Sequence, residues 1–195
     1  MKKYACGISD LKEALKDLNQ AIYYDSKNPD ALFKRGCLKR KFEIYEEALE
    51  DLDKAIGIDP LNIDYLHERA FIKFKLEKYQ EVIEEIDFVI KSISKDSYSF
   101  QLRGFAKYGL ERSEEAMKDF DEAIHLDPNN STNFHYRGLA KFDLGQKEDA
   151  MKDFNIAVIL NPKKEYFEDR SSLRFELGDY YGAIKDTNIA KELKD

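Results

Sequence analysis

A period of 34 residues runs through the chain and constrains its fold more than any other feature. Small residues recur at this interval at Gly36, Ala70, Gly104 and Gly138, and a last step of 33 residues reaches Ser171. A second column begins at Ala14 and a third at Ala21. Such agreement is typical of a repeat array, in which each unit buries its apolar faces only by stacking on its neighbours. The sequence predicts one array over residues 1–195, with a partial repeat at 1–28 and repeats at 29–62, 63–96, 97–130, 131–163 and 164–195.

Each repeat contains two helical patterns separated by residues that break helices. Asn28-Pro29 has the form of an N-cap followed by proline in the first helical position, and Gly145 and Gly178 mark turns inside a repeat. Each repeat is therefore expected to be an antiparallel helical hairpin. First helices are expected near 30–42, 64–76, 98–110, 132–144 and 165–177. Second helices are expected near 10–24, 46–58, 80–92, 114–126, 148–160 and 181–193.

Composition excludes several classes of protein. The chain is 43% hydrophobic, which is too apolar for a disordered chain, and no stretch is long and apolar enough to cross a bilayer. The net charge of −7 and the isoelectric point of about 5.2 argue against a nucleic-acid binder. The first residues carry no signal peptide, so we expect a cytoplasmic protein.

The motif Ala116-x-x-x-Phe120 followed by Pro128 recurs as Ala150-x-x-x-Phe154 followed by Pro162. With the small-residue column, it resembles the signature of the tetratricopeptide repeat family. The resemblance implies an all-α fold, a right-handed superhelical α-solenoid of stacked antiparallel hairpins whose first helices line a concave groove. It also implies a non-catalytic scaffold that binds other proteins.

Two columns depart from the family pattern. Arginine replaces leucine directly before the small residue, and a basic residue replaces tyrosine four positions later, beginning with Lys39. An acidic residue recurs in the second helices. We expect each arginine to donate two parallel hydrogen bonds to one of these carboxylates, in its own hairpin or in the preceding one. The alternative is that both columns are solvated faces. The arginines are Arg35, Arg69, Arg103, Arg137 and Arg170, and the acids are Asp17, Asp51, Glu85, Asp119, Asp153 and Asp186. The repeat at 63–96 departs most and is expected to be the least regular hairpin.

The groove side of the first helices is aromatic in its middle and changes charge along its length. Aromatic side chains dominate binding hot spots, so we expect a peptide or partner helix with an apolar centre, an acidic end toward the first repeats and a basic end toward the last. The alternative is that these aromatic rings pack between adjacent first helices. The expected binding residues are Lys34, Arg40, His67, Phe71, Phe74, Tyr98, Gln101, Phe105, Tyr108, His135, Tyr136, Phe142, Glu168 and Phe175.

No motif indicates catalysis, a cofactor or a metal site. The three histidines lie in different repeats or helices, and no glycine-rich phosphate loop occurs. Cys6 and Cys37 are expected to be reduced thiols, although their positions in neighbouring units leave a close approach open. The basic clamp with which some family members hold a partner's C-terminal carboxylates is absent, because the matching positions hold Phe33, Cys37, Glu68, Tyr98 and Leu102.

The two ends of the array differ. Thr187 and Lys191 stand where earlier repeats have Phe154 and Val158, which predicts a polar terminal face. Residues 1–8 are expected to be only the tail of a first helix, which leaves the helix at 10–24 half covered. The alternative function is therefore a self-assembly module, a homo-oligomer formed through Leu11, Leu18 and Ile22.

Overall fold

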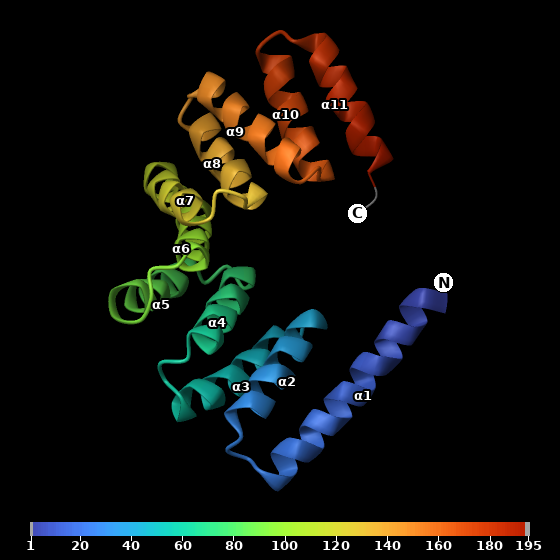
Figure 1. Cartoon of the computed structure of the whole chain (residues 1–195), viewed down its shortest axis with the longest axis vertical. Coiled ribbons are helices and arrows are strands. Elements are labelled where there is room, and N and C mark those ends of the chain that lie inside the picture. The colour runs from blue at the N-terminus through green and yellow to red at the C-terminus, as the bar shows by residue number, and fades with distance from the viewer. Residues whose placement is uncertain (1, 194–195) are drawn as a thin grey trace. The chain divides into compact units, whose positions relative to one another are not determined.

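The computed structural model describes residues 2–193, and the side chains of residues 11–193. This part of the chain forms eleven helices and no strand (Figure 1). The helices are α1 (Lys2–Tyr24), α2 (Pro29–Lys41), α3 (Tyr45–Ile58), α4 (Ile63–Lys75), α5 (Tyr79–Ser92), α6 (Ser97–Gly109), α7 (Ser113–Leu126), α8 (Ser131–Asp143), α9 (Lys147–Leu160), α10 (Lys164–Glu176) and α11 (Tyr180–Glu192).

The predicted hairpins are confirmed. Each helix from α2 to α11 begins and ends within one residue of its expected range, and the two helices of each repeat pack on each other. The prediction for the first segment is wrong, because α1 begins at Lys2 and residues 2–8 are not the tail of a separate helix. The sequence of α1 contains no proline, and its lone Gly7 costs only about 1 kcal/mol of helix stability, which does not end a helix.

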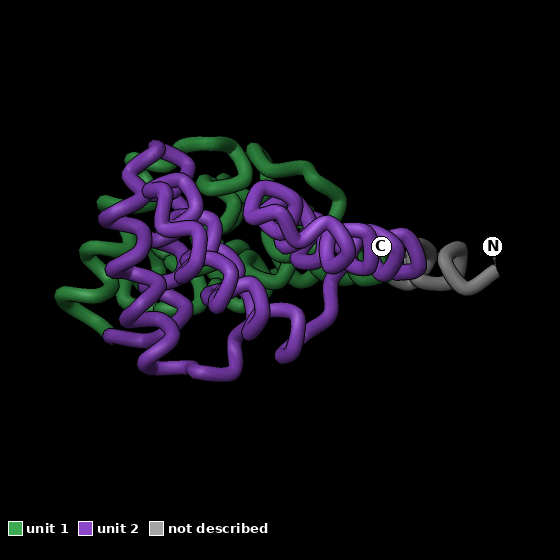
Figure 2. The backbone as a smooth tube through the Cα atoms, turned by 90° about the horizontal axis from the view of Figure 1, so that it is seen from above, with its two compact units in different colours: residues 1–94 green, residues 95–195 purple. Residues whose placement is uncertain are grey.

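The chain divides into two compact units, residues 1–94 (unit 1) and residues 95–195 (unit 2), shown in different colours in Figure 2. In unit 1, α1 packs on α2 and α3 packs on α4; in unit 2, α7 packs on α8 and α9 packs on α10. The α4–α5 pair has the least extensive contact of the five hairpins, as its divergent sequence predicts. It has Ala70 where three other repeats have glycine, so its two helices approach less closely.

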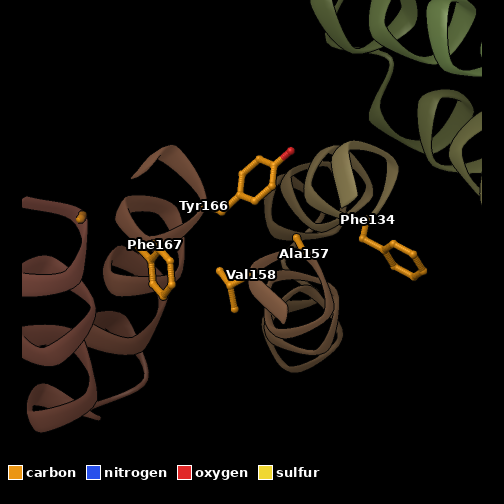
Figure 3. Close-up of a cluster of buried hydrophobic side chains, with 6 residues drawn as sticks. Phe134, Ala157, Val158, Tyr166 and Phe167 are labelled. Atoms are coloured by element: carbon orange, nitrogen blue, oxygen red, sulfur yellow. The ribbon is translucent and has the colours of Figure 1, made fainter. Parts of the chain in front are cut away.

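The core of unit 2 shows how one repeat stacks on the next. Tyr166 and Phe167 of α10 lie beside Ala157 and Val158 of α9 (Figure 3). Both aromatic side chains are buried. The small side chain of Ala157 leaves room for these rings, so the stacking buries apolar surface that a single hairpin would expose.

Close packing inside the hairpins explains the small-residue column. A Cβ atom added to Gly104 would lie 2.7 Å from the ring of Phe120, and one added to Gly138 would lie 2.7 Å from the ring of Phe154. Gly36 faces the smaller Leu52, at 3.2 Å. At the last member of the column, the hydroxyls of Ser171 and Thr187 are 2.9 Å apart. The size of the first-helix residue is therefore matched to the second-helix residue that faces it.

The turns inside the hairpins share one backbone conformation. Glu43, Glu77 and Glu111 have φ angles of 58° to 60°, and Gly145 and Gly178 occupy the same position in later repeats. This left-handed region is costly for every residue except glycine. The predicted turns at Gly145 and Gly178 are confirmed, and three glutamates hold the same strained position.

Glu77→Gly is therefore expected to raise the free energy of unfolding, by about 0.5 kcal/mol. Glycine removes a strain of roughly 1–2 kcal/mol, and the greater freedom of the unfolded chain offsets part of that gain. Urea denaturation followed by circular dichroism measures the change. The matched control is Gly145→Ala, which should lower stability by about 1 kcal/mol. A lower stability of Glu77→Gly would contradict this account of the turn.

The predicted ion pairs are confirmed in all five hairpins. Arg35 donates two hydrogen bonds to Asp51, at 2.8 and 2.6 Å, and Arg103 does the same to Asp119, at 3.0 and 2.6 Å. The pairs of Arg137 with Asp153 and of Arg170 with Asp186 have the same form. Arg69 reaches Glu85 with a single hydrogen bond of 2.8 Å. The extra methylene of glutamate suits the wider α4–α5 hairpin.

The basic residue four positions after each arginine reaches the same acid. Lys39 lies 2.9 Å from Asp51, and Lys141 lies 2.7 Å from Asp153. The same contact recurs for Lys73, Lys107 and Arg174, at 3.0, 2.7 and 3.2 Å. The acids themselves are buried. The arginine and the basic residue four positions later therefore have the same effect, because together they place two cations beside each buried carboxylate.

Four of these arginines, Arg35, Arg69, Arg137 and Arg170, also contact the helix that precedes their own hairpin. The Nη1 atom of Arg137 donates to Asp121 of α7 at 2.8 Å, and that of Arg170 donates to Asn155 of α9 at 2.9 Å. In unit 1, Arg35 donates to Asn19 and Arg69 donates to Asp53. The arginine column thus links consecutive repeats within each unit as well as the two helices of one hairpin.

Candidate functional site

The first helices of unit 2 carry a cluster of aromatic rings. The ring centroids of Phe105 in α6 and Tyr136 in α8 are 4.4 Å apart, and Tyr108 meets Tyr136 edge-on at 6.0 Å. All three side chains are half-buried. These rings pack between adjacent first helices, as the alternative interpretation of the sequence predicts, and they still present part of their surface to solvent. We call Phe105, Tyr108 and Tyr136 the aromatic cluster.

Two of the expected binding residues are buried in contacts between first helices. The amide of Gln101 donates to the side-chain oxygen of Asn133 at 2.6 Å. Nε2 of His135 lies 2.6 Å from a carboxylate oxygen of Asp169, and its ring lies 4.3 Å from that of Tyr166. Gln101 and His135 thus link neighbouring first helices, and both side chains lie beneath the exposed surface of these helices.

The remaining candidates of unit 2 occupy different places. Phe142 is half-buried against a core cluster that contains Phe154, whereas Glu168 is exposed. Tyr98 is 39% exposed. Phe175 is 63% exposed, and its ring lies 5.2 Å from that of Tyr180 at the last turn. Tyr98 and Glu168 are therefore exposed, while Phe142 belongs to the core.

An acidic hollow of about 770 Å³ lies beside the aromatic cluster. Tyr108 and Leu144 form its apolar wall, and its other lining residues are Glu111, Arg112, Ser113, Glu114, Glu115 and Asp143. Burial and the nearby carboxylate of Asp143 raise the pKa of Tyr108 well above its usual range, so its hydroxyl stays protonated. Glu111, Arg112 and the first residues of α7, Ser113 to Glu115, were not predicted as part of the site, although three acids occur in the five residues after Leu110.

The first-helix face of unit 1 is cationic around one aromatic ring. Arg40 lies 5.2 Å and Lys75 lies 5.5 Å from the centroid of Phe71, within the range of cation–π attraction. Arg40 also pairs with Glu68, while Lys34 is exposed. The pair with Glu68 reduces the positive charge that the sequence predicts here, and the two exposed lysines Lys34 and Lys75 keep part of it.

The other expected binding residues of unit 1 are less exposed than Lys34 and Lys75. Phe74 is half-buried, with its ring 5.6 Å from that of Tyr79 at the hairpin turn, and His67 is also half-buried. Cys37 is a free thiol, and burial together with the charge of Glu68 raises its pKa to about 12. It is therefore protonated and unreactive at neutral pH. Cys6, the other thiol considered, lies outside the described side chains.

Part of the N-terminal surface that the sequence suggests for self-association packs against other residues of the same chain. Ile22 packs against a cluster of Leu32, Ala55 and Tyr65. Leu11 and Leu18 are half-buried. Among residues 11–193, no three histidine, cysteine or acidic side chains lie close enough to hold a metal ion. None of the described helices combines the length and apolar character that crossing a membrane requires.

Comparison with known proteins agrees with this architecture. The family model described as "Tetratricopeptide repeat" matches residues 29–60 and 98–130. A search of curated protein sequences finds no match.

Solved structures resemble the chain over most of its length. The pilus biogenesis factor PilW superposes with a TM-score of 0.83 at 17% identity, over 95% of this chain and 86% of that one. TTC0263 of Thermus thermophilus, a thermophilic TPR protein, gives 0.73 at 18% identity, over 84% and 90%. YrrB, described as a TPR protein with an unusual peptide-binding site, gives 0.65 at 16% identity, over 90% and 91%.

These likenesses establish an all-α helical-repeat fold. Two separate repeats match the family model, and the remaining repeats share their period, hairpin geometry and packing columns. The fold is that of a scaffold for protein–protein interaction. Two of its repeats therefore match the tetratricopeptide-repeat family model, and its fold is the one that solved TPR proteins have.

Proposed function

We propose that the chain is a non-catalytic scaffold that binds a peptide or partner helix on the first-helix face of unit 2. The observation that carries the proposal is the aromatic cluster beside the acidic hollow. Half-buried aromatic side chains offer contact area at a low entropy cost, and adjacent carboxylates attract cations. The ligand is a segment with an apolar residue over Tyr108 and Tyr136 and a lysine or arginine directed into the hollow.

The cationic surface around Phe71 supports a second contact of opposite charge. Lys34 and Lys75 are exposed there, and the ring of Phe71 keeps Lys75 close to the surface. An acidic segment of the partner binds this face of unit 1. The apolar and basic segment on unit 2 provides most of the affinity, because exposed charge pairs contribute little on their own.

A peptide-display selection against the immobilised chain tests the proposal. Enriched peptides should pair an apolar residue with nearby lysine or arginine, and their affinity should fall as the salt concentration rises. Enrichment of peptides without basic residues, or affinities independent of salt, would contradict the role given to the acidic hollow.

Tyr108→Ala is expected to weaken a selected peptide by about 1–3 kcal/mol, or roughly 5-fold to 150-fold in Kd. The ring is lost from both the aromatic cluster and the wall of the hollow. Tyr108→Phe keeps the ring and should retain most of the affinity. Tyr24→Ala removes an exposed tyrosine of α1 and should change nothing. Calorimetric titration measures all three, and equal affinity of Tyr108→Ala and the parent would refute the proposed site.

A further inference from the structure

The outward face of the last hairpin is hollowed and half apolar. A cavity of about 600 Å³ opens between α10 and α11, with Phe175, Tyr180 and Ile184 at its apolar end. These side chains are 63%, 59% and 62% exposed. Thr187 and Lys191 also line it, so the predicted polar face covers only one end of the surface. We call this surface the terminal face.

The terminal face corresponds to the surface on which a following repeat packs elsewhere in unit 2. In the repeat 131–163, the ring of Tyr136 lies 4.4 Å from Phe105 and 6.0 Å from Phe120, which belong to the two helices of the preceding hairpin. The residues at the same repeat positions in the last hairpin are Ser172 and Thr187. Both are far smaller than phenylalanine, so the hollow lies where an incoming aromatic ring has the most room.

The terminal face also carries an acceptor that matches an arginine. At four junctions the arginine of the following helix donates its Nη1 hydrogen bond to one position of the preceding helix, and that position holds Asn19, Asp53, Asp121 or Asn155. Asn188 of α11 is the next member of this column, and it is exposed and lines the hollow. No arginine of the described residues reaches it.

We propose that the terminal face binds an amphipathic helix of a partner protein that presents an aromatic residue followed directly by arginine. The ring enters the hollow between Ser172 and Thr187, and the guanidinium donates to Asn188. This order of residues occurs once on a first helix of the chain, at Tyr136 and Arg137, where the two side chains make the equivalent contacts. A second copy stacked end to end does not supply the guanidinium, because α1 and α11 contain no arginine and the arginine at each other repeat junction is held in its own chain.

A synthetic peptide provides the probe. It has the sequence of residues 131–143 with Gly138→Ala to favour the helix, carries a fluorophore and is titrated into the full chain by fluorescence anisotropy. We expect saturable binding, and we expect Arg137→Ala in the peptide to weaken it about tenfold, as the loss of a charge-assisted hydrogen bond does. Against the Asn188→Ala protein the two peptides should bind equally.

Two protein variants separate this surface from others. Asn155→Ala removes the equivalent acceptor, which Arg170 already occupies, and should leave the tenfold difference intact. Ile184→Glu should abolish binding, whereas Tyr108→Ala should not alter it. An undiminished tenfold difference against Asn188→Ala, or no saturable binding, would overturn the proposal. A dimer in analytical ultracentrifugation that Ile184→Glu dissociates would also overturn it, because a second copy would then be the occupant.

Discussion

Asp51→Ala is expected to lower the free energy of unfolding by about 3 kcal/mol. Asp51 is 1% exposed. Its carboxylate accepts two hydrogen bonds from Arg35 and forms a salt bridge with Lys39. Removing it leaves two cations, 16% and 12% exposed, without their main partner. Breaking a buried pair from one side in this way costs more than the pair contributes, because the remaining charge has already lost its water.

The matched control for this variant lies two residues further along the same helix. The side chain of Asp53 is 60% exposed, and it contacts Arg69 at 2.7 Å. Asp53→Ala should cost less than about 1 kcal/mol, as exposed pairs do. Urea denaturation of both variants measures the contrast, and equal losses of stability would show that burial does not determine the strength of these pairs.

The contribution of Asp51 should also depend on pH. Burial alone would raise the pKa of its carboxyl, but the hydrogen bonds from Arg35 and Lys39 outweigh burial and lower it. A carboxyl whose pKa is lowered by folding stabilises the folded state above its unfolded pKa, near 4, and loses that contribution as the pH falls through the folded value. The difference in stability between the parent and Asp51→Ala should therefore shrink as the pH falls below about 4.

Gly138→Ala is expected to lower the free energy of unfolding by about 2 kcal/mol. The added Cβ would lie 2.7 Å from two ring atoms of Phe154 and 3.3 Å from Cβ of Asp153. Phe154 is 1% exposed, so its ring has no free space into which to move. The two helices of the hairpin must separate instead, and this movement also strains the fork between Arg137 and Asp153.

Gly57→Ala is the matched control for this packing effect. No atom lies within 4 Å of the position of its Cβ, and the residue is in the last turn of α3. Alanine should there raise stability by roughly 0.5–1 kcal/mol through helix propensity. Adding Phe154→Leu to Gly138→Ala should restore part of the loss, because Gly36 already faces a leucine at 3.2 Å. A double variant no more stable than Gly138→Ala would contradict this matching of sizes.

The hairpins and the ion pairs were predictable because they depend on positions inside one repeat. Arg103 and Asp119 are 16 residues apart, and the same spacing recurs in every hairpin. The sequence left open whether the arginine reaches its own hairpin or the preceding one, and Arg137 contacts both. The role of Lys141 was missed, although its distance of 12 residues from Asp153 also repeats along the chain.

The candidate site was less predictable because it depends on contacts between repeats. A helical pattern identifies the outward side of a first helix, but the stacking angle decides which of those side chains meet the next first helix. Gln101 and His135 meet it and are buried, whereas Tyr108 remains half-buried at an open hollow. The acidic wall of that hollow combines Glu111 of the turn after α6 with Glu114 and Glu115 at the start of α7 and Asp143 at the end of α8, and a helical pattern does not show that these side chains meet.

The arginines that span the junctions within each unit determine how these units open. Within each unit, an arginine such as Arg170 ties three helices together, so fraying of the last hairpin must break its bonds to both Asp186 and Asn155. Local opening is then coupled to the loss of a whole junction rather than of single turns. Native-state hydrogen exchange should show amides of α10 and α11 exchanging with one shared free energy, as a single cooperative segment.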